Sequence, residues 1–378
     1  MVLSIRRTDS RTAPRPSATT GERLALWYVP VPNIGGVARH TLDAVRAGVP
    51  GWRIVVLCPP GALADELRAR GAAVVTGPVS PADGARTAVA GVRRMLEHLR
   101  PDVLHTHLAF ADIVGIAAAT GVRAGHGGRV RVVSTEHGIA GVRGYYQKSR
   151  VQARAKSSAH RARLMRTDAV IAVSESTREQ ILGQWWQGAR VQVVRNGVDA
   201  PTDPVAPDAG LRVLSLSRLA PEKRIDQLLR AFALVAAKRS DAALTVAGTG
   251  PEEDSLREVA SQLGLGERVR FVGHVDAAHA LREHDVVAQF SDWENLSYTL
   301  LDAVAAGLGV VATDVGGNRE IVPARCLVDA ADHRTAAETI IAQGQNLEER
   351  PRPEESGAAW TVADMTASIA DVYAGVLR

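Results

Sequence analysis

The chain has 378 residues, of which 46% are hydrophobic and 23% are charged, and its formal net charge is +4. This length suffices for two domains of ordinary size, and the composition is that of a soluble globular protein. The mild charge gives little support to nucleic-acid binding, and no apolar run approaches the roughly 20 residues of a membrane-spanning helix.

The first predicted strand follows a polar leader. Residues 1 to about 22 carry charges and prolines where a signal peptide has an apolar core, so we expect a disordered leader. Residues 24–31 form an apolar run that leads to Gly35 and Gly36, and residues 41–47 are typical of a helix. A strand–glycine–helix unit brings bare backbone to a ligand, although a tight turn also favours glycine. Both glycines are therefore candidate ligand contacts.

Strand and helix patterns alternate through the rest of the first half. Expected strands are 52–58, 73–76, 102–105, 130–134, 168–173 and 191–195, and expected helices are 62–70 and 87–99. His105, His107 and His137 fall just past predicted strand ends, where open α/β sheets bind ligands. One of them could instead be structural. No nearby Cys or His has the spacing of metal ligands, so we predict no metal site.

A basic segment interrupts the alternation at residues 143–166. It holds eight Arg or Lys residues and no acid, and Tyr145 and Tyr146 lie within it. Such a segment can lie on anionic lipid, which suggests peripheral membrane contact. A solvated helix face and a binding site for an anionic acceptor are the alternatives.

A linker separates two halves of similar pattern. Residues 199–210 are rich in Pro, Asp and Gly, so we expect the domain boundary there. The second half has expected strands at 212–217, 243–247, 268–272, 286–290, 309–313 and 322–327, and expected helices at 225–238, 252–263 and 298–306. Residues 360–377 also have helical spacing. This pattern indicates a second α/β domain.

One glycine motif in the second half looks like a dinucleotide fingerprint but differs in detail. Gly248 and Gly250 follow a predicted strand, yet Glu253 stands at the third glycine position. Together with Glu252 it would repel a pyrophosphate. We therefore do not expect a nicotinamide cofactor.

Two cations follow the first strand of the second half. Arg218 and Lys223 are five positions apart across a loop that contains proline. Cations that converge at the end of a strand can neutralise a diphosphate leaving group. Routine surface charges are the alternative.

Residues 291–318 carry two acids, Glu294 and Asp302, around the start of a predicted helix. Ser297 is expected to cap that helix and Gly307 to end it. Free backbone N–H groups at a helix start suit a phosphate, whereas the carboxylates need hydroxyls to accept from. A nucleotide-sugar has both a diphosphate and several diols.

The motifs form an ordered series that is similar to a known family. SRLAPEKRIDQLLRAF, AGTGPEEDSL, FVGH and SDWENLSYTLLDAVAAGLGVVATDVGGNREIV follow GGVARH, LHTHLAF, STEHG, AVIAVSES and VVRNGVD. The series resembles the retaining family 4 glycosyltransferases of the GT-B fold and covers residues 24 to about 375. The resemblance implies an α/β fold with two Rossmann-like domains facing a cleft. Residues 23–198 would be the acceptor domain, 199–358 the nucleotide-sugar domain, and 359–378 a helix crossing back to the first domain.

The resemblance also implies residue roles. Glu294 would accept from donor-sugar hydroxyls, Asp302 from the ribose, and Arg218 and Lys223 would hold the diphosphate. His137 would approach the sugar near the reacting centre, and with Glu294, Arg218 and Lys223 it forms the expected catalytic set. The remaining contacts would be backbone N–H groups of Gly35, Gly36, Asn295, Leu296 and Ser297 at the phosphates, His274 and Val275 beside the base, and Arg39 and His40 on the acceptor side.

Four positions depart from the usual family pattern. Asp302 replaces Glu, Asn295 and Arg224 replace Gly, and Gly309 replaces Pro. Asp302 keeps the charge. Asn295 would add a side chain beside the sugar that tunes donor choice, and Arg224 would either add a third cation near the phosphates or point outward.

The implied reaction is metal-independent and needs no cofactor. A sugar would move from a nucleotide diphospho-sugar, with UDP favoured by the resemblance, to a hydroxyl of a glycan, a lipid-linked saccharide or a small metabolite, with retention. Two alternatives remain: a nucleotide-sugar epimerase or hydrolase, and a non-catalytic binding subunit. Cys58 and Cys326 lie far apart in apolar contexts, which favours reduced thiols. We therefore expect a cytoplasmic protein, with the inner face of the membrane as the place of any lipid contact.

Overall fold

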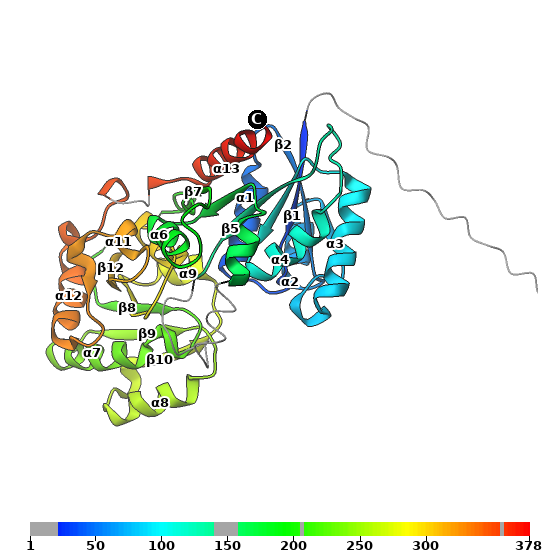
Figure 1. Cartoon of the computed structure of the whole chain (residues 1–378). Helices are drawn as coiled ribbons and strands as arrows, with labels where there is room; N and C mark the ends of the chain where they lie inside the picture. The colour runs from blue at the N-terminus through cyan, green and yellow to red at the C-terminus, as the bar shows by residue number, and fades with distance from the viewer. Residues whose placement is uncertain (1–21, 140–157, 205–207, 356–358) are drawn as a thin grey trace, which may run out of the picture.

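The computed structural model describes residues 22–139, 158–204, 208–355 and 359–378. The expected leader, apart from its last residue, and residues 143–157 of the basic segment lie outside these ranges. The described chain forms two parallel sheets flanked by helices, as the sequence predicts (Figure 1). No helix in the described ranges is both long and apolar enough to cross a membrane.

The first sheet has strand order β3-β2-β1-β4-β5-β6-β7. Its strands are β1 (Arg23–Tyr28), β2 (Trp52–Cys58), β3 (Val74–Thr76), β4 (Val103–His107), β5 (Arg131–Glu136), β6 (Ala169–Ala172) and β7 (Val191–Val193). The helices are α1 (Gly36–Ala47), α2 (Ala62–Ala69), α3 (Ala85–Leu99), α4 (Ala109–Ala119), α6 (Glu175–Gln184) and the helical residues 158–164. Parallel strands are joined by crossover helices, and these helices cover both faces of the sheet. The strands are therefore buried on both sides, which is why they are short apolar runs.

The second sheet has strand order β10-β9-β8-β11-β12-β13. Its strands are β8 (Arg212–Leu216), β9 (Ala243–Ala247), β10 (Val269–Gly273), β11 (Val286–Gln289), β12 (Gly309–Thr313) and β13 (Leu327–Val328). The helices are α7 (Ile225–Lys238), α8 (Glu253–Gln262), α9 (Ala277–Arg282), α10 (Tyr298–Ala305), α11 (Asn318–Ile321) and α12 (His333–Gln345). The prediction of a strand at 322–327 was wrong for most of these residues, because β13 begins only at Leu327. Pro323 has no N–H for a ladder, and it caps a short 3₁₀ turn at Ala324–Cys326.

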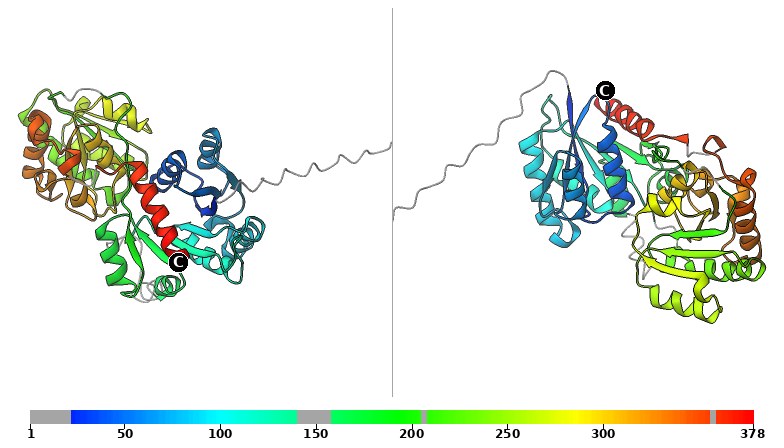
Figure 2. Two further views of the ribbon diagram at one scale, coloured as in Figure 1. Left: turned by 90° about the horizontal axis from the view of Figure 1, so that it is seen from above. Right: turned by 180° about the vertical axis from the view of Figure 1, so that it is seen from behind.

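The last helix, α13 (Val362–Leu377), returns to the first domain, as expected (Figure 1, Figure 2). It begins at a capping box in which Thr361 and Asp364 bond each other's backbone N–H groups at 3.0 and 3.1 Å. Met365, Ile369 and Tyr373 are buried in one core with residues of β1 and β2. The first domain is therefore completed by residues from the far end of the chain.

Each sheet has one point where the strand order reverses. In the first sheet the reversal falls between β1 and β4, and in the second between β8 and β11. At such a point the crossover helices leave on opposite faces and open a crevice at the carboxyl ends of the strands. Gly35 and Gly36 follow β1, Lys223 follows β8, and Glu294 follows β11. The fold thus places the main sequence candidates at the two reversal points.

Candidate active site

Lys223 and Glu294 meet at the reversal point of the second sheet. Lys223 ends the short turn Pro221–Lys223 after β8, and its ammonium group forms an ion pair with the Glu294 carboxylate after β11. Ser291 donates its hydroxyl to the same carboxylate at 2.9 Å. The Asp292 N–H also donates to the Glu222 carbonyl at 2.8 Å, which ties the two loops together. The candidate diphosphate cation and the candidate sugar-binding acid are therefore adjacent.

Arg218 lies on the same loop with a more exposed side chain. Its side chain is 61% exposed, and Nη2 lies 2.5 Å from the Glu222 carboxylate. Gly248 and Gly250 pack under this loop. A Cβ at Gly248 would collide with the Ser217 carbonyl oxygen, and one at Gly250 with the Leu219 carbonyl oxygen. These glycines therefore serve close packing of two loops.

Helix α10 begins and ends where the sequence predicts. The Ser297 hydroxyl caps it by accepting from the Leu300 N–H at 3.4 Å, and Gly307 follows its end with a φ of +73°. Leu296 and Ser297 are buried beside this helix start. Glu294 therefore lies in the loop that leads into the first N–H groups of α10.

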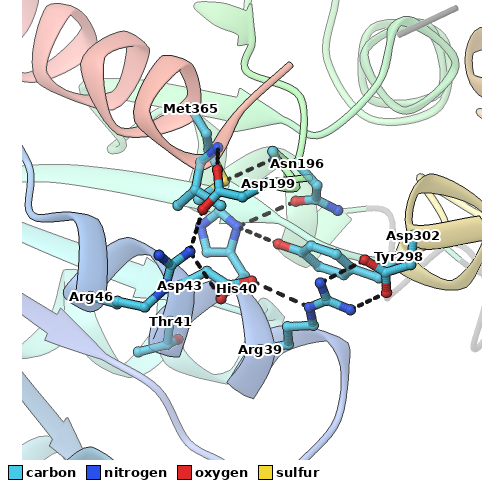
Figure 3. Close-up of polar contacts among 12 residues, drawn as sticks. Arg39, His40, Thr41, Asp43, Arg46, Asn196, Asp199, Tyr298, Asp302 and Met365 are labelled. Carbon is cyan, nitrogen blue, oxygen red and sulfur yellow. Dashed lines mark hydrogen bonds and ion pairs between the residues drawn. The ribbon is translucent and has the colours of Figure 1, made fainter. Parts of the chain in front are cut away.

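Asp302 on α10 contacts the first domain (Figure 3). Both of its carboxylate oxygens pair with the Arg39 guanidinium of α1, and Nη2 and Oδ1 are 2.8 Å apart. The guanidinium also lies over the Tyr298 ring at 4.6 Å from the centroid. Burial raises the pKa of the Asp302 carboxyl, against the effect of Arg39. A ribose at Asp302 would have to share or displace Arg39, and Arg39 reaches towards α10 instead of the expected acceptor side.

Three histidines from separate elements gather on the first domain. The Nδ1 of His107 and the Nε2 of His137 are 2.9 Å apart, so one donates to the other. The His40 ring meets the His137 ring edge-on at 4.8 Å between centroids. Burial lowers the pKa of His40 to about 4 and holds the pKa values of His107 and His137 well below the ordinary value. This edge of the site is therefore neutral at physiological pH.

His105 has a structural position. Its two ring nitrogens lie 2.6 Å from the Tyr373 hydroxyl and 2.6 Å from the Thr135 hydroxyl, and the ring is fully buried. The structural alternative considered for one of these histidines thus applies to His105.

The histidine cluster is also the candidate metal-binding group. Ligand nitrogens of His40, His107 and His137 lie within 4.8 Å of one another. Sequence spacing missed this because the three residues come from α1, β4 and the loop after β5. Nitrogens around one tetrahedral zinc ion are about 3.3 Å apart, given Zn–N bonds of 2.0–2.1 Å, whereas His107 Nδ1 and His137 Nε2 are 2.9 Å apart, so the cluster would have to rearrange. Metal independence stays a prediction.

Gly35 and Gly36 have no structural need for glycine. Gly35 caps α1 with an extended φ of −173°, and neither residue has a left-handed φ. A Cβ at either position would meet no protein atom within 4 Å. A tight turn therefore does not explain the pair, and ligand contact at these glycines stays a prediction.

The remaining candidates lie around the same sheet edge. His274 and Val275 directly follow β10, and His274 is exposed whereas Val275 is half-buried. Both were expected to border the base of the donor. Arg224 adopts a left-handed φ of +46° and donates to the Asp292 carboxylate at 2.8 Å, so its charge faces an acid. The side chain of Asn295 was expected beside the sugar, and the structure gives it partners in the first domain.

A buried ion cluster was missed from the sequence. The Arg163 side chain is only 2% exposed and pairs with Asp112 and with Glu136, which lies 2.5 Å away. Burial lowers the pKa of Arg163 to about 10. Arg163 belongs to the basic segment but points inward, so that segment is not one uniform cationic face. Because Glu136 directly precedes His137, the ion cluster supports the loop after β5 that begins with His137 and includes Ile139, which we call the histidine loop.

Comparison with known proteins places the chain in a family. The profile of Glycosyltransferase Family 4 matches residues 34–201, and that of Glycosyl transferases group 1 matches residues 202–360. The chain belongs to the family 4 glycosyltransferases of the GT-B fold.

The family relatives are distant. A GDP-mannose-dependent alpha-(1-6)-phosphatidylinositol monomannoside mannosyltransferase of Mycobacterium tuberculosis is 30% identical over 55% of this chain and 62% of that protein. Glycogen synthase of the same organism is 28% identical over 78% of each chain. The structure of Anabaena HepE in complex with UDP-glucose has a TM-score of 0.73 at 20% identity, over 94% of this chain and 98% of that one. This last likeness is one of fold.

Proposed function

We propose that this family 4 glycosyltransferase moves a sugar from a nucleotide diphospho-sugar to an acceptor hydroxyl with retention of configuration. One observation carries the proposal: Lys223 and Glu294 form an ion pair at the reversal point of the second sheet. Gly35, Gly36 and His137 occupy the corresponding edge of the first domain. A cation, hydroxyl acceptors and bare backbone are the groups that a nucleotide-sugar needs.

The donor would lie along the edge of the second sheet. Lys223, Arg218 and the first N–H groups of α10 would hold the diphosphate, since cations and a helix start both stabilise phosphate charge. Glu294 would accept from sugar hydroxyls and Asp302 from the ribose. His274 and Val275 would border the base.

The transfer would proceed on one face of the sugar. The bond from the anomeric carbon to the diphosphate oxygen breaks through an oxocarbenium-like state, and the acceptor oxygen bonds to that carbon from the same side. The departing diphosphate takes the acceptor proton, and Lys223 and Arg218 stabilise its charge. His137 would lie near the reacting carbon as a neutral imidazole. Contact between the domains would exclude water and limit hydrolysis.

The donor and acceptor are proposed by class. The similar proteins are described as GDP-mannose-dependent or as bound to UDP-glucose, so a hexose on a nucleoside diphosphate is the favoured donor, with UDP tested first. The acceptor would be a glycan, a lipid-linked saccharide or a small metabolite. We further propose a cytoplasmic protein that meets anionic membrane through the basic segment at residues 143–166. Co-sedimentation with anionic vesicles that weakens with salt would support this, and equal binding to neutral vesicles would contradict it.

A donor panel tests the function. Thermal unfolding is measured with UDP-, GDP- and ADP-sugars, because a bound donor raises the apparent stability. The donor with the largest shift is then incubated with and without an acceptor saccharide. Transfer should need the acceptor. A new sugar isomer without acceptor would indicate an epimerase, and binding without turnover would indicate a binding subunit.

A further inference from the structure

The side chain of Asn295 reaches from the second domain into the first. Its Oδ1 accepts a hydrogen bond from the Ile139 N–H at 3.1 Å and another from the Thr177 hydroxyl at 3.3 Å. Ile139 lies two residues after His137, and Thr177 is in the first turn of α6. Asn295 is only 6% exposed. One buried amide oxygen therefore joins the histidine loop and a helix of the first domain to the segment that carries Glu294.

That segment is closely packed within its own domain. A Cβ at Gly316 would collide with the Glu294 carbonyl oxygen, and one at Gly317 with the Asn295 carbonyl oxygen, so two glycines let the backbones pack in direct contact. The Thr313 hydroxyl donates to the Ser291 carbonyl at 2.6 Å. Glu294 and Asn295 are consecutive, with the first side chain paired to Lys223 and the second bound to the first domain. A shift of the histidine loop would therefore be transmitted to Glu294.

A second contact fixes the adjoining residue. The Asn196 side-chain amide donates to the Leu296 carbonyl at 3.2 Å, and its Oδ1 lies 3.3 Å from the His40 Nδ1. Leu296 is thus tied to the histidine cluster by another route. A Cβ at Gly138 would come within 3.5 Å of the Asn295 Nδ2, so the backbone beside His137 lies against the amide. These two links join the domains beside the histidine cluster, and Asn295 makes the one nearest His137. Other contacts that cross the boundary are the Arg39–Asp302 ion pair and the bonds of Glu320 to Arg195 and to the first N–H groups of α6.

We propose that Asn295 is a positioning residue that fixes the separation between His137 and Glu294, the two side chains that face the donor sugar from opposite domains. Its role in turnover rests on the proposed glycosyl transfer. Positioning matters because small misplacement of reacting groups lowers rates strongly. The same contact limits water at the anomeric carbon. In the competing hydrolysis, water bonds to that carbon as the diphosphate leaves and its proton passes to the diphosphate, so a looser contact raises hydrolysis relative to transfer.

Four variants separate this role from simple loss of stability. Asn295→Ala removes the shared acceptor, and Thr177→Val removes one donor at nearly constant shape. Thr177→Ser restores the hydroxyl and serves as the conservative rescue. Asn346→Ala, at an exposed asparagine after α12, is the matched control. Thermal unfolding of each variant shows that it is folded before kinetics are compared.

The first measurement needs no donor. Spin labels are placed on exposed residues through Arg94→Cys on α3 and Arg334→Cys on α12. The native Cys58 and Cys326 are buried, and burial raises the pKa values of their thiols to about 11 and about 12, so they stay unlabelled. We expect a narrow distribution of distances between the two labels in the otherwise wild-type protein, in Thr177→Ser and in the control. In Asn295→Ala we expect a broader distribution. An unchanged distribution in Asn295→Ala would overturn the proposal.

The second measurement uses the donor that gives the largest thermal shift. We expect Asn295→Ala to lower kcat about tenfold, the scale of losing one to two neutral hydrogen bonds, with little change in donor Kd. Hydrolysis should rise several-fold relative to transfer, and Thr177→Val should show a smaller effect that Thr177→Ser lacks. A raised donor Kd with unchanged kcat would overturn positioning in favour of direct donor contact. If the wild-type protein binds no nucleotide-sugar, the proposed function fails, while the label distances still decide whether Asn295 holds the domains in register.

Discussion

The edges of the two sheets carry opposite kinds of chemistry. In the second domain the side chains are charged and paired, with Lys223 on Glu294 and Arg218 on Glu222. In the first domain the corresponding edge has neutral imidazoles and the bare backbone of Gly35 and Gly36. A diphosphate needs compensation of its charge, whereas a sugar needs hydrogen bonds and exclusion of water. On the proposed function, the leaving group would therefore bind to the second domain and the reacting sugar would lie between the two.

The contacts between the edges sharpen this comparison. Charge crosses the boundary at Arg39 and Asp302, and neutral hydrogen bonds cross it at Asn295. The charged contact lies on the helix predicted to bind ribose, and the neutral contact lies beside the residues predicted to bind the sugar. Changes at these positions should therefore affect different steps.

The largest expected effect on turnover comes from removing the positive charge of Lys223 at the edge of the second sheet. Lys223→Ala should lower kcat at least about 100-fold, the scale of losing one group that stabilises the transition state. Steady-state transfer assays measure this, with Lys238→Ala on the exposed side of α7 as the control. Unchanged kinetics in Lys223→Ala would remove the diphosphate assignment, and an equal loss in the control would show that the effect is not local.

The neutral edge should make stability depend on pH. Burial lowers the pKa of His40 to about 4 from an ordinary value of 6.5, so the unfolded chain binds more protons between these values. This contribution to stability is complete above pH 6.5 and is lost as pH falls towards 4, by roughly 3 kcal/mol for His40 alone. Urea unfolding between pH 4 and 8 measures it. His40→Gln should flatten the slope while His98→Gln, on an exposed part of α3, should not; equal slopes would contradict the neutral-edge description.

The charged contact between the domains should affect donor affinity. Asp302→Asn should raise the donor Kd about tenfold, because charge-assisted bonds to the ribose are weakened. Arg39→Ala should lower it about threefold, since Arg39 occupies Asp302 in the donor-free protein and its removal disfavours only that state. Calorimetric titration compares both with Arg46→Ala, because Arg46 lies on the same helix as Arg39 and pairs with Asp199 (Figure 3). Weaker binding in Arg39→Ala would show that Arg39 assists the donor instead of competing with it.

The smallest expected effect concerns metal ions. Excess EDTA should leave the transfer rate within about twofold, because cations of the chain are expected to stabilise the diphosphate in place of a metal. Metal content measured by mass spectrometry on the purified protein accompanies the assay. A loss of activity on chelation that zinc restores would instead identify His40, His107 and His137 as ligands.

The local structure was largely predictable, and the contacts between distant residues were not. Apolar runs located most strands within a few residues. Ser297 and Gly307 mark the start and the end of α10, as expected. Helix α4 was missed because AFADIVGIAAA is apolar on most sides and shows no amphipathic stripe. The histidine cluster and the Arg163 ion pairs depend on sheet order, which joins residues about 30 to 100 positions apart and leaves no local signal. The sequence marks Asn295 as a departure from the family pattern, but only the structure shows that its side chain bonds to residues of the first domain.

The return of α13 has a consequence for synthesis of the protein. Residues 23–193 leave the ribosome well before residues 362–377, yet Tyr373 and its neighbours fill the core against β1 and β2. Until then the first domain exposes an apolar face and lacks the hydroxyl beside His105. A domain that emerges first but closes last depends on chaperones or on the second domain to avoid aggregation during translation. Tags or fusions that hinder the docking of α13 would act on folding yield before they act on catalysis.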